Sequence, residues 1–284
     1  MTGMFTASGF RPAARVLVYG LGVMALGVLS ACSLNRTAAR VTSGVIDKGL
    51  PSVFSQADAQ YVKEALPANL QLMEILLKSD PDDKTLLVNA SRGFCGYALL
   101  FLEDESPERA SGFYAKGEAY AARALKGAAP AAARKSDVPP LFWNTFCKAL
   151  YINLNRDKPE AVAELPTLEP AIEKLLELEP SYYYNGPQCL LGAYYSIRPR
   201  MFGGDPDKAK KHFELALKGA GENFLLNRFL YAKLAAVAAQ DPELFENLLN
   251  AVLSAGPREG ETRLIDEVAK TKAKKLLEKK DELF

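Results

Sequence analysis

Hydrophobic residues recur three and four positions apart from about Gln56 to the end of the chain, and no stretch shows the alternation of a half-buried strand. The breaks between these segments fall at clusters of proline, glycine and aspartate. Two of them, Asp205-Pro206 and Asp241-Pro242, place an N-capping carboxylate before a proline, whose missing N–H costs nothing at the first helical position. The pattern therefore predicts an all-α fold.

The predicted helices fall into similar pairs. The segment Ala124-Leu-Lys-Gly-Ala128 returns as Ala216-Leu-Lys-Gly-Ala220. Each copy closes a helix with small or aromatic residues at fixed offsets: Gly117, Ala121 and Ala124 in one, and Ala209, Phe213 and Ala216 in the other. This is the spacing of the second helix of a tetratricopeptide repeat, a motif of roughly 34 residues. The first-helix spacing is approached at Trp143-x2-Phe146-Cys147-x2-Leu150 and at Gln188-x2-Leu191-Gly192-x2-Tyr195.

We therefore expect a tetratricopeptide-like array of about four helical hairpins. They should lie near residues 84–128, 140–179, 187–220 and 222–255. A leading helix at 56–78 and a trailing helix at 258–282 would act as capping helices, which cover the apolar surface that a terminal repeat otherwise exposes.

The first 31 residues have a different composition. A basic leader from Met1 to Arg15 precedes an uncharged run from Val16 to Leu29, which is shorter than the roughly 20 residues of a spanning helix. Such a run is typical of a signal peptide. Leu29-Ser30-Ala31-Cys32 then resembles the lipobox of bacterial lipoproteins, which implies cleavage before Cys32 and acylation of that cysteine. An ordinary secretory signal with a chance cysteine is the alternative.

These features divide the chain into a signal peptide (1–31), a lipidated N-terminus and tether (32–55) and a tetratricopeptide-like helical domain (56–284). The acyl chains would anchor the protein to a membrane, with the domain facing the periplasm. Ser33 rather than aspartate follows the cysteine, which by the sorting habit of enteric lipoproteins favours the outer over the inner membrane.

Charge and catalytic motifs exclude several classes of function. The 35 basic and 34 acidic residues nearly cancel, so we expect no nucleic-acid partner, which needs a basic surface. His212 is the only histidine, and there is no Gly-x-Ser-x-Gly, phosphate loop or histidine and acid cluster. We therefore expect no enzyme activity, no catalytic residue, no metal and no cofactor.

Three cysteines remain after Cys32, namely Cys95, Cys147 and Cys189. They are odd in number and contain no C-x-x-C pair, so they indicate neither a zinc site nor a dense disulfide framework. We interpret them as small buried residues, and at most one disulfide could form among them.

Short segments spread through the mature chain carry a family resemblance in their order and spacing. They are Glu64-Ala-Leu-Pro67, Leu141-Phe-Trp143, Glu164-Leu-Pro166, Leu176-Glu-Leu-Glu-Pro180, Gly186-Pro187, Leu191-Gly192, Gly203-Gly204-Asp205, His212-Phe213 and Asp281-Glu-Leu-Phe284. Together they resemble the TatT family, the tetratricopeptide lipoproteins associated with TRAP-type transporters. One departure is Asn185-Gly186-Pro187, where the family pattern has Gly-Gly-Pro.

The resemblance implies an accessory role in transport. The protein would work beside the periplasmic substrate-binding component of a TRAP-type transporter and bind a small hydrophobic or carboxylate ligand. The alternative is an envelope scaffold that binds other proteins through the same groove without a small molecule. A homo-oligomer, for which a trimer is conceivable, is left open.

Two insertions around residues 187–197 supply the first candidate binding site. Their aromatic rings and arginines suit an apolar body with a carboxylate head. The residues are Tyr182, Tyr183, Tyr184, Tyr194, Tyr195, Arg198, Arg200 and Phe202. The alternative is that these rings fill a gap between irregular hairpins.

A basic stripe supplies the second candidate site. Aligning the first helices of the pairs on Gly192 brings Arg92, Lys148 and Lys233 into one register, at a position that faces the groove in ordinary tetratricopeptide repeats. Such a stripe would attract an anionic ligand or an acidic partner surface. The alternative is that these are three separate, solvated side chains.

Overall fold

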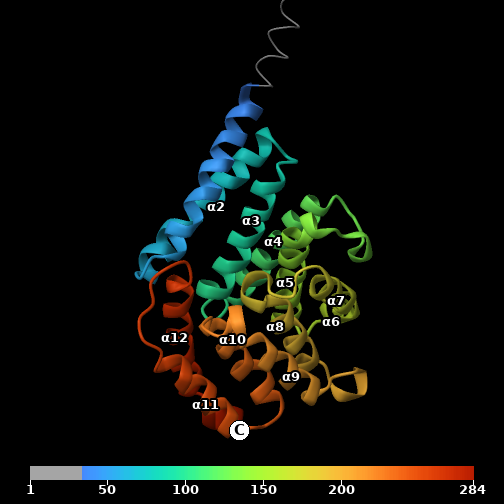
Figure 1. The fold of residues 1–284 in the computed structure, drawn as a ribbon, viewed down its shortest axis with the longest axis vertical. Coiled ribbons are helices and arrows are strands. Elements are labelled where there is room, and N and C mark those ends of the chain that lie inside the picture. The colour runs from blue at the N-terminus through green and yellow to red at the C-terminus, as the bar shows by residue number, and fades with distance from the viewer. Residues whose placement is uncertain (1–33) are drawn as a thin grey trace, which may run out of the picture.

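The computed structural model describes residues 34–284, which contain helices and no strand (Figure 1). The predicted all-α fold is confirmed. The signal peptide and Cys32 lie outside the described residues, so cleavage and acylation stay predictions, as does the division of the chain at residues 31 and 55.

Most helices associate in consecutive pairs. After a helix at residues 34–54, the elements are α2 (Ala59–Ser79), α3 (Lys84–Tyr97), α4 (Pro107–Leu125), α5 (Val138–Leu154), α6 (Pro159–Ala163), α7 (Leu168–Leu178), α8 (Tyr182–Ile197), α9 (Pro206–Ala216), α10 (Leu225–Leu230), α11 (Pro242–Leu253), α12 (Arg263–Leu277) and α13 (Lys280–Leu283). The pairs are α3 with α4, α5 with α7, α8 with α9, and α10 with α11. The tetratricopeptide-like character of these pairs stays a prediction.

The predicted caps form as expected. The carboxylate of Asp205 accepts hydrogen bonds from the backbone N–H groups of Asp207 and Lys208, at 3.1 and 3.0 Å. The carboxylate of Asp241 accepts one from Leu244, at 2.9 Å. These bonds satisfy N–H groups that have no partner within the first helical turn.

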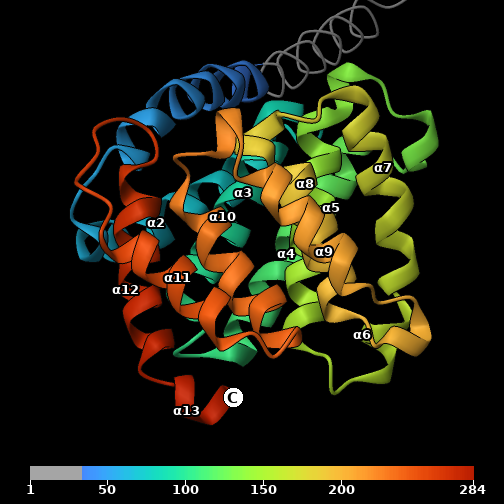
Figure 2. The same ribbon diagram turned by 60° about the horizontal axis from the view of Figure 1, so that its bottom comes forward.

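The trailing helix α12 contacts elements from both ends of the array. Helix α12 packs on α11 and also reaches α2 and the chain that follows α3, and the two views agree that it lies beside α2 (Figure 2). The charged pair of Lys272 and Asp104, at 2.5 Å, joins α12 to the end of that segment. The trailing helix therefore closes one side of the array as well as covering its last pair.

A disulfide fastens α3 to α5. Cys95 and Cys147 are bonded across a Cα–Cα distance of 5.7 Å, and α4 passes them at Gly117. A β-carbon at Gly117 would collide with the sulfur of Cys95 and would lie 2.9 Å from that of Cys147. The absence of a side chain at this position is what allows the three helices to meet. Cys189 is a free, buried thiol.

Residues 34–54, expected as part of a tether, form one helix that lies against the domain. The Asp80 side chain, which has no exposed surface, accepts hydrogen bonds from Nε of Arg36 at 2.8 Å and of Arg40 at 2.6 Å. Burial raises the pKa of Asp80, but the bonds from Arg40 and Arg36 outweigh it and hold that pKa below its ordinary value. The first turns of this helix are thus fixed to the end of α2.

Candidate functional site

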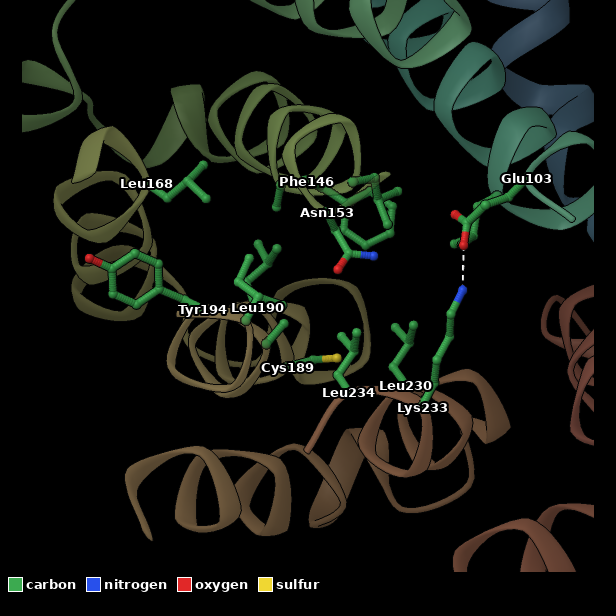
Figure 3. Close-up of a pocket in the computed structure, with 15 residues that line it drawn as sticks. Glu103, Phe146, Asn153, Leu168, Cys189, Leu190, Tyr194, Leu230, Lys233 and Leu234 are labelled. Atoms are coloured by element: carbon green, nitrogen blue, oxygen red, sulfur yellow. Dashed lines mark hydrogen bonds and ion pairs between the residues drawn. The ribbon is translucent and has the colours of Figure 1, made fainter. Parts of the chain in front are cut away.

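An apolar pocket lies where the first helices of the four pairs converge (Figure 3). The cavity itself has a volume of about 40 Å³, and the empty space reaches about 590 Å³ when the open solvent at its mouth is included. Its wall is formed by Leu99 and Glu103 after α3, Phe146, Ala149, Leu150 and Asn153 of α5, Leu168 of α7, Cys189, Leu190, Ala193, Tyr194 and Ile197 of α8, and Leu230, Lys233 and Leu234 of α10 and its extension. Most of these side chains present only carbon, so the pocket suits an apolar molecule.

One wall of the pocket carries an ion pair. The ammonium of Lys233 is hydrogen-bonded to the carboxylate of Glu103, although 130 positions separate the two residues (Figure 3). The Tyr114 hydroxyl donates a second hydrogen bond to Glu103, at 2.5 Å. Glu103 is buried, with 6% of its side chain exposed, and Lys233 keeps 25%. Burial, and then the negative charge of Glu103, raise the pKa of the Tyr114 hydroxyl, which therefore stays protonated and donates.

Both members of this pair come from π-helical turns. Ala98–Leu102 continues α3 as a π-helix, and the N–H of Glu103 bonds the carbonyl of Ala98 at 2.9 Å. Tyr231–Ala236 continues α10 in the same way and contains Lys233. Insertions of this type often occur at functional sites, because they redirect side chains that a regular helix would place elsewhere.

Asn153 supplies a second polar group to the lining. Its amide points into the space between α5, α8 and the α10 segment (Figure 3). The Oδ1 atom is buried and has no hydrogen-bond partner. Buried polar atoms without a partner are uncommon, and they invite the explanation that a ligand or water completes them.

The first predicted site divides into two groups at opposite ends of α8. Tyr182, Tyr183 and Tyr184 lie at its start, and Arg198, Arg200 and Phe202 follow its end. With 1.5 Å per helical residue the two groups are roughly 20 Å apart. The expectation that they form one cluster was wrong, because a helix continues from the left-handed turn at Tyr183–Asn185 to Ile197 and separates the two insertions.

The tyrosines at the start of α8 are half-buried and pack against other aromatic rings. Tyr183, Tyr184 and Asn185 adopt left-handed backbone angles, with φ of 44°, 57° and 60°. Tyr184 stacks on Phe224 with ring centroids 4.4 Å apart, and the Tyr183 centroid is 4.9 Å from that of Trp143. Asparagine takes this backbone region more readily than most residues do, which explains why Asn185 can stand where the family pattern has glycine.

The residues at the other end of α8 differ in exposure. Tyr194 and Tyr195 both donate their hydroxyl hydrogens to Glu169, at 2.8 and 3.0 Å, and Arg198 bonds the Tyr194 hydroxyl. Burial, and then Glu169, raise the pKa of Tyr194 to about 12. In contrast, Arg200 and Phe202 lie in an exposed short helix, with 63% of Phe202 accessible.

The three residues of the basic stripe have separate partners. The Arg92 guanidinium lies over the Phe54 ring, 4.1 Å from its centroid. Lys148 forms ion pairs with Glu118 at 3.2 Å and Glu164 at 3.1 Å. Of the three, only Lys233 lines the apolar pocket. Among all the predicted binding residues, Tyr194 and Lys233 are the two that line it.

Sequence patterns could not have identified Glu103 and Asn153. Neither residue belongs to a motif, and each has ordinary neighbours along the chain. The alignment of the first helices could indicate only that α3, α5 and α10 share one face. In the structure, the extension of α3, helix α5 and the extension of α10 surround one space.

Metal-binding clusters and membrane-spanning helices are the two remaining features of residues 34–284 that bear on function. No group of three or more histidine, cysteine or acidic side chains there could hold a metal ion. One helical stretch, Lys84–Leu102, is long and apolar enough to cross a membrane, but 67% of its most apolar window is buried inside the protein, as in a core helix.

Fold and pocket together define an all-α protein of paired helices that surround an apolar pocket. A sequence model of the TRAP transporter T-component family matches residues 55–284, and the chain belongs to that family. No curated protein matches the chain. The family is one of transporter components rather than enzymes, and a TRAP transporter component acts at the membrane, facing the periplasm.

Proposed function

We propose that this protein binds a small, mostly apolar molecule in the pocket between its first helices and serves the periplasmic substrate-binding component of a TRAP-type transporter. The observation that carries the proposal is the pocket itself. Protein interiors are normally close-packed, yet here four first helices leave an apolar space with very few polar groups. The proposed role is binding and transfer, without catalysis.

The protein would be held at the membrane by acyl chains on Cys32. The helix at residues 34–54 and the Arg36 and Arg40 contacts to Asp80 would then keep the domain close to its anchor. Two or three acyl chains give stable attachment, whereas one gives only a marginal hold. Ser33 supports the outer membrane as the location.

A scaffold that binds other envelope proteins, with no small ligand, is the second candidate. The exposed segment Arg200–Phe202 favours it, since 83% of Met201 and 63% of Phe202 are accessible to solvent. Apolar side chains that project singly are common on surfaces, but two adjacent ones on a short helix form a usable contact for a partner protein.

Native mass spectrometry distinguishes the two candidates. The mature chain, residues 32–284 with Cys32→Ser, would be exported behind an unrelated secretory signal and purified without detergent. We expect a non-covalent small-molecule adduct that Ala193→Phe abolishes, because the ring would occupy the pocket. Ala122→Phe, on the exposed face of α4, is the control and should keep the adduct. A chain that carries no adduct but still captures the substrate-binding component would support the scaffold instead.

A further inference from the structure

We infer that the pocket selects a neutral amphiphile, an apolar body that carries a hydroxyl group, over an anionic one of the same length. The inference rests on the proposed function, because it concerns the ligand of that same pocket. It also replaces the carboxylate ligand that the sequence alone suggested.

The cation of the pocket is already neutralised. Lys233 is paired with Glu103, and Tyr114 supports that carboxylate with a second hydrogen bond at 2.5 Å. The neighbouring Asp104 carboxylate is paired with a different ammonium, that of Lys272 at 2.5 Å, so Lys233 is left to Glu103. An entering carboxylate would therefore meet an ammonium whose charge Glu103 already neutralises, in surroundings that solvate ions poorly.

A hydroxyl group, in contrast, has a matching partner. The buried Oδ1 atom of Asn153 accepts no hydrogen bond, and a ligand hydroxyl could donate to it. A carboxylate has no hydrogen to donate at neutral pH. The amide NH2 of the same side chain could in turn donate to the hydroxyl oxygen, so one Asn153 side chain can recognise both functions of an alcohol.

The remaining polar atoms of the lining do not offer a site for an anion. The Tyr194 hydroxyl is directed to Glu169, away from the pocket, and its ring alone borders the space (Figure 3). Burial raises the pKa of the Cys189 thiol to about 12, so that side chain stays neutral. The polar recognition of a ligand thus falls to Asn153.

The test compares 1-decanol with decanoate, which share their chain length and differ in the polar group. Isothermal titration calorimetry at about pH 8, where decanoate is ionised, would use the detergent-free mature chain after removal of any co-purified molecule. We expect 1-decanol to bind at least about tenfold more tightly, the factor that a modest charge penalty produces. Equal or tighter binding of decanoate would overturn the inference and leave the proposed ligand function intact. Absence of binding by both probes would overturn both.

Two variants assign the selectivity to its residues. Asn153→Leu should reduce the preference by weakening decanol binding, whereas Asn250→Leu, exposed on α11, should not change it. Glu103→Gln frees the charge of Lys233 and should tighten decanoate binding about tenfold, so that the preference for decanol shrinks. If Glu103→Gln is poorly folded, Lys233→Met tests the same ion pair from the other side. It removes the ammonium and leaves the Glu103 carboxylate unpaired, so decanoate binding should weaken further. If whichever of these two variants folds leaves decanoate binding unchanged, the role of the Lys233–Glu103 ion pair would be contradicted.

Discussion

Gly192 of α8 and Phe213 of α9 meet so closely that a β-carbon at Gly192 would lie 2.7 Å from Cδ2 of the ring. Phe213 is fully buried, and its ring also stacks on Tyr231 with centroids 4.9 Å apart. The ring therefore has no free space into which it could move, and the contact fixes the distance between the two helices.

Gly192→Leu should destabilise the protein by about 1–3 kcal/mol, the usual cost of overpacking a close helix crossing. Urea unfolding followed by circular dichroism measures the change. Gly112→Leu is the matched control, because Gly112 is a helical glycine in α4 with nothing near its missing β-carbon. It should be neutral or slightly stabilising. Equal unfolding midpoints for the two variants would contradict the crossing described above.

Reduction of the Cys95–Cys147 disulfide should lower the free energy of unfolding by roughly 2–4 kcal/mol, because the bridge restricts a long loop of the unfolded chain. The two cysteines are 52 positions apart. Urea unfolding with and without a reductant reports the difference. In the double variant Cys95→Ala and Cys147→Ala the reductant should have no effect, and a remaining effect there would assign it to another thiol.

Acidification should release the helix at residues 34–54 from the domain. The folded-state pKa of Asp80 lies below its unfolded value, so its carboxylate stabilises the contact above about pH 4 and the stabilisation is lost as the pH falls through the folded-state pKa. The protection of residues 34–54 against hydrogen exchange, relative to the intrinsic rate at each pH, should fall at low pH. Asp80→Asn should show the lower protection already at neutral pH, whereas Asp82→Asn, on the exposed turn after α2, should not.

Asn227→Ala should cost about 1–3 kcal/mol, the penalty for leaving a buried polar group without its partner. The Asn227 amide donates to the carbonyl of Tyr184 at 2.8 Å and thereby helps to hold the left-handed turn at the start of α8. Thermal unfolding measures the loss, with the exposed Asn250→Ala as control. A difference of less than a few tenths of a kcal/mol from that control would mean that the aromatic packing of Tyr184 holds the turn alone.

Cys32→Ala should free the protein from the membrane while the helical domain stays folded, because the proposed acyl chains would attach to that cysteine alone. To avoid retention by an uncleaved leader, the variant would follow an ordinary secretory signal. Cell fractionation should recover it in the soluble periplasm, and the chain with Cys32 and its own leader should sediment with membranes. Sedimentation of the variant after a high-salt wash would argue against the lipid anchor.

Local features of this chain were decided by its sequence. Helices, their starts at Asp205 and Asp241, and the close crossing at Gly192 follow from interactions within a few residues or within one helical hairpin. Such interactions repeat with the helical period, so a pattern in the sequence can reveal them. The predicted leader and lipobox likewise rest on consecutive residues.

The pocket and its chemistry were decided only by the tertiary structure. Glu103 meets Lys233 across 130 positions, Cys95 meets Cys147 across 52, and the two aromatic insertions that flank α8 are separated by the helix between them. Which side chains meet over such distances depends on how every intervening helix is rotated and spaced, and two π-helical turns change that rotation at the pocket wall. A helical period shows which face of a helix is apolar, but the partner of that face is fixed only when all the helices pack together.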